Sequence, residues 1–504
     1  MLLSRDREGA VSERNNPTGP HAKLLAVNVV RPKWIAWICI GIFLVLVTAS
    51  IIRRTPWWDE GCYADPAVSL VEKGRMGSTV AGEQQWGMLP TIHDYTYWIP
   101  PFYPAGLSIA FRVLGVSLFS MRAYSFFFSL LAVAAWFVVG RELTGRASIG
   151  WLASALLASD FAFIQLAGTG RPDAMVLGSG TAGLAAYLLL RNRSLPWAVL
   201  ASWTLCGLAM FTHPTGFQFA CDLLIITVWL DWRRLRPVHA LWAALPVAVF
   251  AACWAGYIAQ SPAAFEEQFI GHIRARTAAR DTRLEATLLD IKHRYFVFYF
   301  TGLHGVERIK VVGLILYGAA FAAIAFNARL RSSTYARIAV AVAVVNYLLL
   351  ANLDRGAFPH YMPMVLAPCA LVAAIWIGDA METRSRAAWV ALSLFAASFA
   401  ISVGGHGAKM IANSYDDEFR PLVERIRPLI ADRGYIIAGS EFAFGFGFTP
   451  QVRDDVRLGT DKPEPPKAIV FNQFDLREQR FGPNALALGF RPTVRTKNFV
   501  LYER

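Results

Sequence analysis

A series of uninterrupted apolar stretches, each about 17–22 residues long, constrains this chain more than any other feature. A helix of about 20 residues crosses the hydrocarbon core of a bilayer and satisfies its own backbone hydrogen bonds there. The composition agrees with this, because 55% of the 504 residues are hydrophobic and only 17% are charged. The sequence therefore predicts an all-α polytopic membrane protein.

About eleven stretches have the length and apolar character of a membrane span. They are residues 34–52, 119–139, 148–167, 173–190, 196–212, 214–230, 239–258, 308–326, 336–352, 359–379 and 387–404. The first follows a polar tail, residues 1–33, which is too long for the basic region of a signal peptide and is predicted to be cytoplasmic.

The arginines in the short loops predict the orientation of the chain in the membrane. With the N-terminus in the cytoplasm, the short outer loops hold only Arg171 and Arg355. The short inner loops then hold Arg141, Arg146, Arg191, Arg193, Arg233, Arg234, Arg236, Arg329, Arg331, Arg337, Arg384 and Arg386. This bias towards the cytoplasmic side accounts for the net charge of +13 without nucleic-acid binding, which we exclude as a function.

This topology predicts how the chain is divided. A transmembrane domain covers 34–404 and carries two large outer loops, 53–118 and 259–307. Residues 405–504 form a small α/β domain outside the membrane. In that domain, short apolar runs at 435–438, 468–471 and 499–502 are typical of strands, and 416–432 is typical of an amphipathic helix.

Ionisable residues close to a membrane are costly and are candidates for function. Asp59 and Glu60 follow the first span, between tryptophans and a glycine, and the topology places them outside. The alternation of spans brings further polar residues to the same surface. They are Arg171, Asp173, His213, Asp354, Arg355, His360 and Tyr361.

Structural roles remain open for each of these candidates. Asp59, Glu60 and Asp173 are also typical of the first turn of a helix, where carboxylates are favoured. Tyr361, Trp98 and Tyr103 are also typical of the aromatic belt at a membrane interface. Carboxylates can hold a divalent cation or act without one, so metal dependence is open and no cofactor is required by the sequence.

The order of motifs resembles the GT-C glycosyltransferases, in particular the bacterial relatives of protein O-mannosyltransferases and of the aminoarabinose transferase that modifies lipid A. The resemblance covers residues 34–404. Its motifs are the Asp59-Glu60 pair, the Pro-Pro-x-Tyr segment that ends at Tyr103, Arg-x-Leu-Thr-Gly-Arg at 141–146, Arg-Pro-Asp at 171–173, Thr-His-Pro at 212–214 and His-Tyr at 360–361.

The resemblance implies transfer, with inversion, of a sugar from a polyprenyl-phosphate-linked donor to an envelope acceptor, which is a glycolipid, a polymer or a protein. It also implies a bacterial inner membrane with the site on the periplasmic side. Asp59 would be the catalytic base that deprotonates the acceptor, and Asp173 a second catalytic residue that orients the acceptor or a cation. Glu60 would be a supporting acidic group. Trp98, Tyr103 and His213 would contact substrate.

The leaving phosphate needs charge stabilisation, for which we expect Arg171, Arg355, His360 with Tyr361, or the run that contains Lys292 and Arg294. In the aminoarabinose transferases, Glu-Lys precedes the double proline and the lysine meets the lipid phosphate. Here these positions are Trp98 and Ile99, so the contact must come from elsewhere.

Two other functions fit the sequence less well. A transporter or flippase of a lipid-linked saccharide would also need polar residues in the membrane, but here the ionisable residues gather at one surface and no inverted repeat is evident. A non-catalytic envelope scaffold would use the C-terminal domain to bind a partner.

Overall fold

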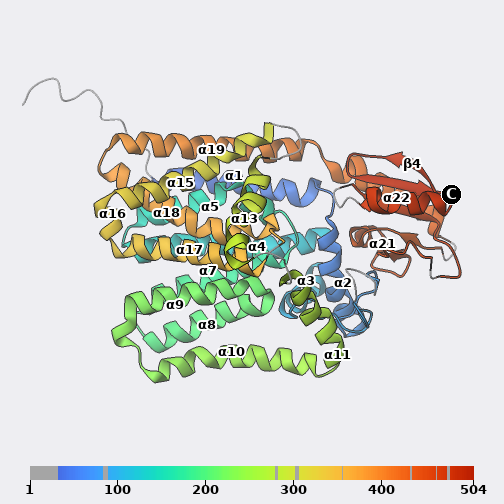
Figure 1. Ribbon diagram of the computed structural model, residues 1–504, viewed down its shortest axis with the longest axis horizontal. Helices are drawn as coiled ribbons and strands as arrows, with labels where there is room; N and C mark the ends of the chain where they lie inside the picture. The colour runs from blue at the N-terminus through green and yellow to red at the C-terminus, as the bar shows by residue number, and fades with distance from the viewer. Residues whose placement is uncertain are drawn as a thin grey trace, which may run out of the picture.

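The computed structural model describes residues 32–82, 89–277, 282–300, 306–354, 356–431, 434–460, 462–473 and 477–504. Long helices lie side by side in a bundle, and a small C-terminal domain covers one end of it (Figure 1). The polytopic helical class and the C-terminal α/β domain predicted from the sequence are both confirmed.

The bundle is built from the apolar stretches of the sequence. Its helices are α1 Pro32–Arg53, α4 Leu118–Thr144, α5 Ala147–Ser159, α6 Phe161–Ala167, α7 Pro172–Leu190, α8 Leu195–Thr212, α9 Phe217–Asp231, α10 Pro237–Ile258, α15 Val311–Phe326, α17 Thr334–Leu353, α18 Met362–Glu382 and α19 Arg386–Ile411. The short helix α16, Ala328–Ser332, joins α15 to α17. The last bundle helix, α19, continues past residue 404.

Among the described residues, nine helices are long and apolar enough to cross a membrane, and a bent pair makes a tenth. The bent pair is α5 and α6, predicted as one straight span, which turns by 70°. Asp160 causes the break, because its carboxylate accepts a hydrogen bond from the Phe163 amide at 3.0 Å and so caps a new helix. The remaining predicted span, 214–230, is the 15-residue helix α9, about 22 Å long.

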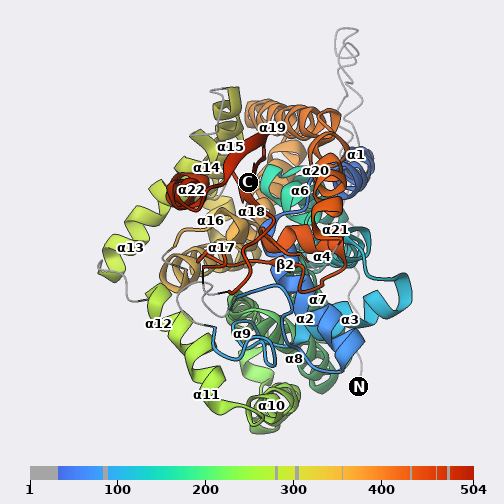
Figure 2. The same cartoon turned by 90° about the vertical axis from the view of Figure 1, so that its right-hand side faces the viewer.

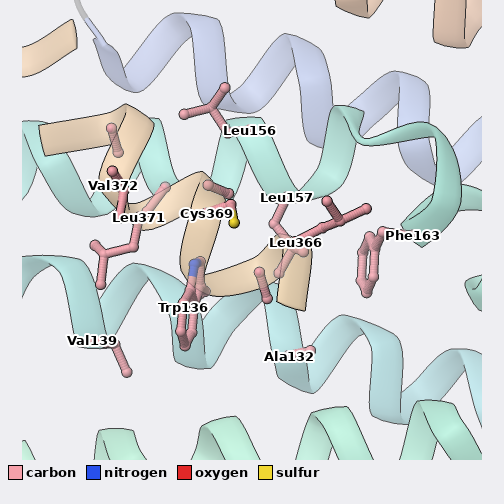
Figure 3. Close-up of a cluster of buried hydrophobic side chains, with 14 of the residues drawn as sticks. Ala132, Trp136, Val139, Leu156, Leu157, Phe163, Leu366, Cys369, Leu371 and Val372 are labelled. Carbon is pink, nitrogen blue, oxygen red and sulfur yellow. The ribbon is translucent and has the colours of Figure 1, made fainter. Parts of the chain in front are cut away.

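Helix α18 forms the centre of the bundle and is buried over almost its whole length. Figure 3 shows Leu366 and Cys369 of α18 packed among side chains of α4, α5 and α6. Helices α4 and α7 approach closely at Gly178, where an added Cβ would lie 2.3 Å from the carbonyl oxygen of Phe128. Small residues therefore allow close helix packing, as is common in membranes.

At the end of the bundle that the C-terminal domain covers, the segments between the long helices form a layer. The layer contains α2 Trp58–Lys73, α3 Phe102–Leu114, α11 Pro262–Phe265, α12 His272–Thr277, α13 Arg283–Asp290 and α14 Val297–Phe300. Figure 2 shows α2 and α3 beneath the C-terminal domain, and α11 to α13 along one flank. The end of the predicted outer loop 53–118 thus contains a helix, α3.

The C-terminal domain contains a five-stranded mixed sheet in the order β2-β1-β3-β5-β4. Its elements are α20 Arg420–Ile426, β1 Ile436–Ile437, α21 Ala443–Phe446, β2 Val452–Arg453, β3 Ala468–Asn472, α22 Arg477–Ala487, β4 Arg491–Arg495 and β5 Phe499–Glu503. Strands β2, β1 and β3 are parallel, and β5 pairs antiparallel with β3 and β4.

Both faces of this sheet are buried, because alternate residues of a strand point to opposite sides. Val470 and Leu501 pack towards α20 and the outer layer. Ile469 and Val500 pack on the other side with Ala485 of α22. The domain is thus joined to the membrane domain through an apolar core as well as through the chain.

A polar contact fixes this domain against α2. The buried carboxylate of Asp454 accepts hydrogen bonds from the Trp58 indole and, at 2.7 Å, from Arg477. The opposing backbones meet at Gly61, where an added Cβ would lie 2.1 Å from the carbonyl oxygen of Ser440. Only glycine allows the C-terminal domain to approach α2 this closely.

We therefore predict that Gly61→Ala weakens the docking of the C-terminal domain by about 1–3 kcal/mol, the usual cost of overpacking. Hydrogen exchange should become faster in the segment 440–442. Gly407→Ala in α19 is the matched control, because nothing lies within 4 Å of an added Cβ there. Equal protection in both variants would show that the contact at Gly61 does not hold the domain.

Candidate active site

A cavity of about 920 Å³ lies at the end of the bundle that the C-terminal domain covers, and it is lined by residues of the bundle, of α2 and of that domain. We call it the main cavity. Its lining includes seven of the residues predicted from the sequence, namely Asp59, Trp98, Arg171, His213, Asp354, His360 and Tyr361. Segments far apart in the chain thus bring most of the predicted cluster together.

The centre of the site is an ion-pair chain of three residues. Asp59, in the first turn of α2, pairs with Nη1 of Arg171. The Nε of Arg171 donates to Asp173 Oδ2 at 2.7 Å. The Asp59 side chain is 18% exposed, whereas Arg171 is 3% and Asp173 0% exposed. Of the two carboxylates, Asp59 is therefore the one that faces the cavity, and Asp173 lies behind Arg171.

Aromatic rings surround the Arg171 guanidinium. Its Cζ lies 5.1 Å from the ring centre of Trp57 and 5.6 Å from that of Tyr63. Trp98 stacks on Tyr63 with ring centres 5.1 Å apart. These rings restrict the guanidinium and give the cavity flat apolar walls beside its charged groups.

Glu60 faces away from the main cavity and forms a buried pair with Arg122 of α4. The two side chains are 0% and 1% exposed, and Arg122 donates to both carboxylate oxygens at 2.7 Å. The amides of Gly170 and Trp57 also donate to Glu60, at 2.6 and 2.8 Å. Burial raises the pKa of a carboxyl, but Arg122 and these amides together hold the pKa of Glu60 below its ordinary value.

The two predicted histidines line the same cavity. His213 Nδ1 hydrogen-bonds Thr215 at 2.9 Å, and its Nε2 lies 3.4 Å from the hydroxyl of Tyr361. The ring of His360 meets the edge of Trp57, with centres 4.3 Å apart. Both histidines and Tyr361 are positioned by packing at the ends of α8 and α18.

Besides Glu60 and Asp173, three predicted residues that the structure describes, Tyr103, Lys292 and Arg294, are absent from the lining of the main cavity. Tyr103 is fully buried behind Tyr63 and lies 3.2 Å from the Ser125 hydroxyl. Arg294 is buried between Asp290 and Asp354, with its NH groups bonded to both and to backbone carbonyls. Lys292 is exposed outside the cavity, and Arg355 falls outside the described residues.

The sequence did not indicate several residues of the cavity. Trp57 and Tyr63 flank the predicted acidic pair, and their aromatic character beside charged residues was the available signal. Arg457, Arg477 and Arg480 enter from the C-terminal domain. Nothing in the local sequence marks these arginines, because only the docking of that domain brings them to the site.

A second cavity, of about 460 Å³, adjoins the first and shares Trp57, Arg171 and His360 with it. Its lining includes the cationic residues Arg54, Lys409 and Lys497 and the acidic residue Glu418. Asp59 does not line it. Within the part of the chain that the structure describes, no group of three or more His, Cys, Asp or Glu is arranged to hold a metal ion.

The chain has the GT-C fold, which it shares with two solved structures. A family model described as dolichyl-phosphate-mannose-protein mannosyltransferase matches residues 99–269. Among curated proteins, no sequence matches the chain significantly.

Two solved structures illustrate the likeness. ArnT from Cupriavidus metallidurans is 16% identical, over 93% of this chain and 97% of that one, with TM-scores of 0.62 for its apo state and 0.58 for its state bound to undecaprenyl phosphate. The oligosaccharyltransferase of Archaeoglobus fulgidus in its apo form is 13% identical, over 86% of this chain and 70% of that one, with a TM-score of 0.51.

We predict that Glu60→Gln destabilises the protein by about 3–5 kcal/mol, because Arg122 is left buried without its counter-charge. The matched control is Glu72→Gln, an exposed position on the same helix. Thermal unfolding of the two purified variants measures the difference. Equal stability would show that the buried pair does not hold α2 in place.

The lowered pKa of Glu60 also predicts a pH dependence. The stabilisation is complete above the ordinary carboxyl pKa of 4.5 and is lost as the pH falls through the lower folded value, since the unfolded state takes up the proton first. Unfolding midpoints measured between pH 7 and 3 should fall more steeply for the wild type than for Glu60→Gln. Parallel curves would contradict this.

Proposed function

We propose that this protein is an inverting glycosyltransferase that takes a sugar from a polyprenyl-phosphate-linked donor, with Asp59 as its general base. The observation that carries the proposal is the position of Asp59, whose carboxylate faces the main cavity while its pairing with Arg171 orients it. The family match from residue 99 to 269 and the shared fold support the same chemistry.

In this reaction a hydroxyl of the acceptor gives its proton to Asp59 as its oxygen attacks the anomeric carbon. The bond between that carbon and the phosphate oxygen breaks, and its electron pair leaves with the phosphate. Attack opposite the leaving group inverts the configuration in one step. Asp173 is a positioning residue, because it contacts Arg171 and lies outside the cavity lining.

The substrates are proposed as classes. The donor sugar is a hexose or a pentose, and the acceptor is a glycolipid, a polymer or a protein of the cell envelope. Trp98, His213, His360 and Tyr361 line the space in which these molecules would meet. The arginine-rich short loops support an N-terminus in the cytoplasm and a site on the periplasmic side of a bacterial inner membrane.

We predict that Asp59→Asn leaves a folded, inserted protein whose transfer rate is at least about a hundredfold lower, because the amide cannot accept the proton. Transfer is measured by mass spectrometry of envelope glycolipids and glycans from cells that carry each variant. Asp94→Asn is the matched control, since Asp94 is a half-exposed partner of Arg75 in the same outer loop. Turnover retained by Asp59→Asn would remove the assigned base.

The main alternative is a transporter or flippase of a lipid-linked saccharide. In liposomes that contain a lipid-linked sugar and no acceptor, we expect the protein to leave the sugar on the leaflet where it began. Translocation of the lipid without formation of a glycosidic bond would favour the transporter.

A further inference from the structure

The leaving group of the proposed reaction is a phosphate, and positive charge in the site would stabilise it as it leaves. Whatever the acceptor, transfer from a polyprenyl-phosphate sugar converts a phosphate diester into a monoester, which carries more negative charge. Groups that meet the developing charge accelerate the reaction more than groups that bind both states equally. The cavity must therefore present cations that carboxylates have not already neutralised.

Among the described residues, Arg171 is the arginine that the membrane domain contributes to the lining of the main cavity, and carboxylates neutralise it. Arg171 lies between Asp59 and Asp173. Arg294 lies between Asp290 and Asp354, outside the cavity lining. Each of these guanidinium groups thus faces two carboxylates, and neither supplies net positive charge.

The C-terminal domain places three arginines on the same cavity. Arg477, Arg480 and Phe481 are spaced i, i+3 and i+4 on α22, which puts them on one face of that helix. Arg477 is occupied, since it pairs with Asp454 and lies over the ring of Trp58. Arg457 follows β2 and reaches the cavity from a second segment of the domain.

Arg457 and Arg480 differ from the other arginines at this cavity. Both are exposed, and within the described part of the chain neither side chain forms an ion pair. The Cζ of Arg480 lies 5.0 Å from the ring centre of its neighbour Phe481. Two guanidinium groups with unused donors therefore share a cavity with the carboxylate of Asp59.

We infer that Arg457 and Arg480 bind the phosphate of the polyprenyl-phosphate donor, so that the C-terminal domain completes the active site. Guanidinium groups suit this task, because their paired N–H donors match phosphate oxygens and keep their charge at any physiological pH. The inference rests on the proposed function. It also supplies the phosphate contact that the residues at 98 and 99 cannot make, since these are tryptophan and isoleucine.

The second cavity offers a competing set of cations, Arg54, Lys409 and Lys497. That cavity does not include Asp59, so a phosphate bound there would be separated from the base by the shared wall of Trp57, Arg171 and His360. The main cavity is the better site, because one reaction needs the base and the leaving group in the same space.

The test uses the full-length protein in lipid nanodiscs and undecaprenyl phosphate as the probe, with binding followed by tryptophan fluorescence. The variant Arg457→Gln/Arg480→Gln should bind at least about tenfold more weakly than the wild type at low salt, and its affinity should depend less on salt. The variant Lys409→Gln/Lys497→Gln, in the second cavity, should bind within about twofold of the wild type. Unfolding midpoints confirm that each variant is folded.

Two results would overturn the inference while leaving the proposed function intact. One is unchanged affinity in the Arg457→Gln/Arg480→Gln variant. The other is loss of binding in the Lys409→Gln/Lys497→Gln variant alone, which would place the phosphate in the second cavity. A wild-type protein that binds no undecaprenyl phosphate would contradict the proposed function itself, and the inference with it.

Discussion

The buried ion pair between Glu60 and Arg122 is the interaction on which the site depends. Arg122 also donates to the backbone carbonyls of Arg54 and Thr55, both at 2.9 Å, so one guanidinium ties α4 to the end of α1 and to the start of α2. Through the amide of Gly170, Glu60 additionally fixes the segment that leads into α7. Asp59 precedes Glu60, and Arg171 follows Gly170, so the bonds of Glu60 to Arg122 and to the Gly170 amide hold both residues in place. The pairing of Asp59 with Arg171 follows from that geometry.

The adjacent carboxylates 59 and 60 thus have different environments. Glu60 accepts several hydrogen bonds and holds α2 against the bundle, whereas Asp59 pairs with one guanidinium and faces the cavity. A helix places neighbouring side chains about 100° apart, so the same turn of α2 points one carboxylate into the bundle and the other towards the main cavity. The predicted separation of roles between these two residues is consistent with their surroundings, and the roles themselves remain to be tested.

Much of the bundle and part of the site could be predicted because both follow from local pattern. Apolar length gave the spans, and alternation of loops placed Asp59, Arg171, His213 and His360 at one surface. The bend at Asp160 was missed because a single capping residue outweighed a continuous apolar run. The burial of Arg294 was missed because its second partner, Asp354, lies 60 residues away, and the entry of Arg457 and Arg480 depends on docking between distant parts of the chain.

The contact between Trp58 and Asp454 joins residues that are 396 positions apart. A membrane protein enters the bilayer in the order of synthesis, so α2 and its carboxylates emerge long before the sheet that closes over them exists. Until that sheet has folded, the indole of Trp58 lacks its acceptor and the main cavity lacks the wall that contains Arg457, Arg477 and Arg480. The cavity that contains Asp59 therefore stays open through most of biosynthesis, and it is enclosed only when the C-terminal domain has folded.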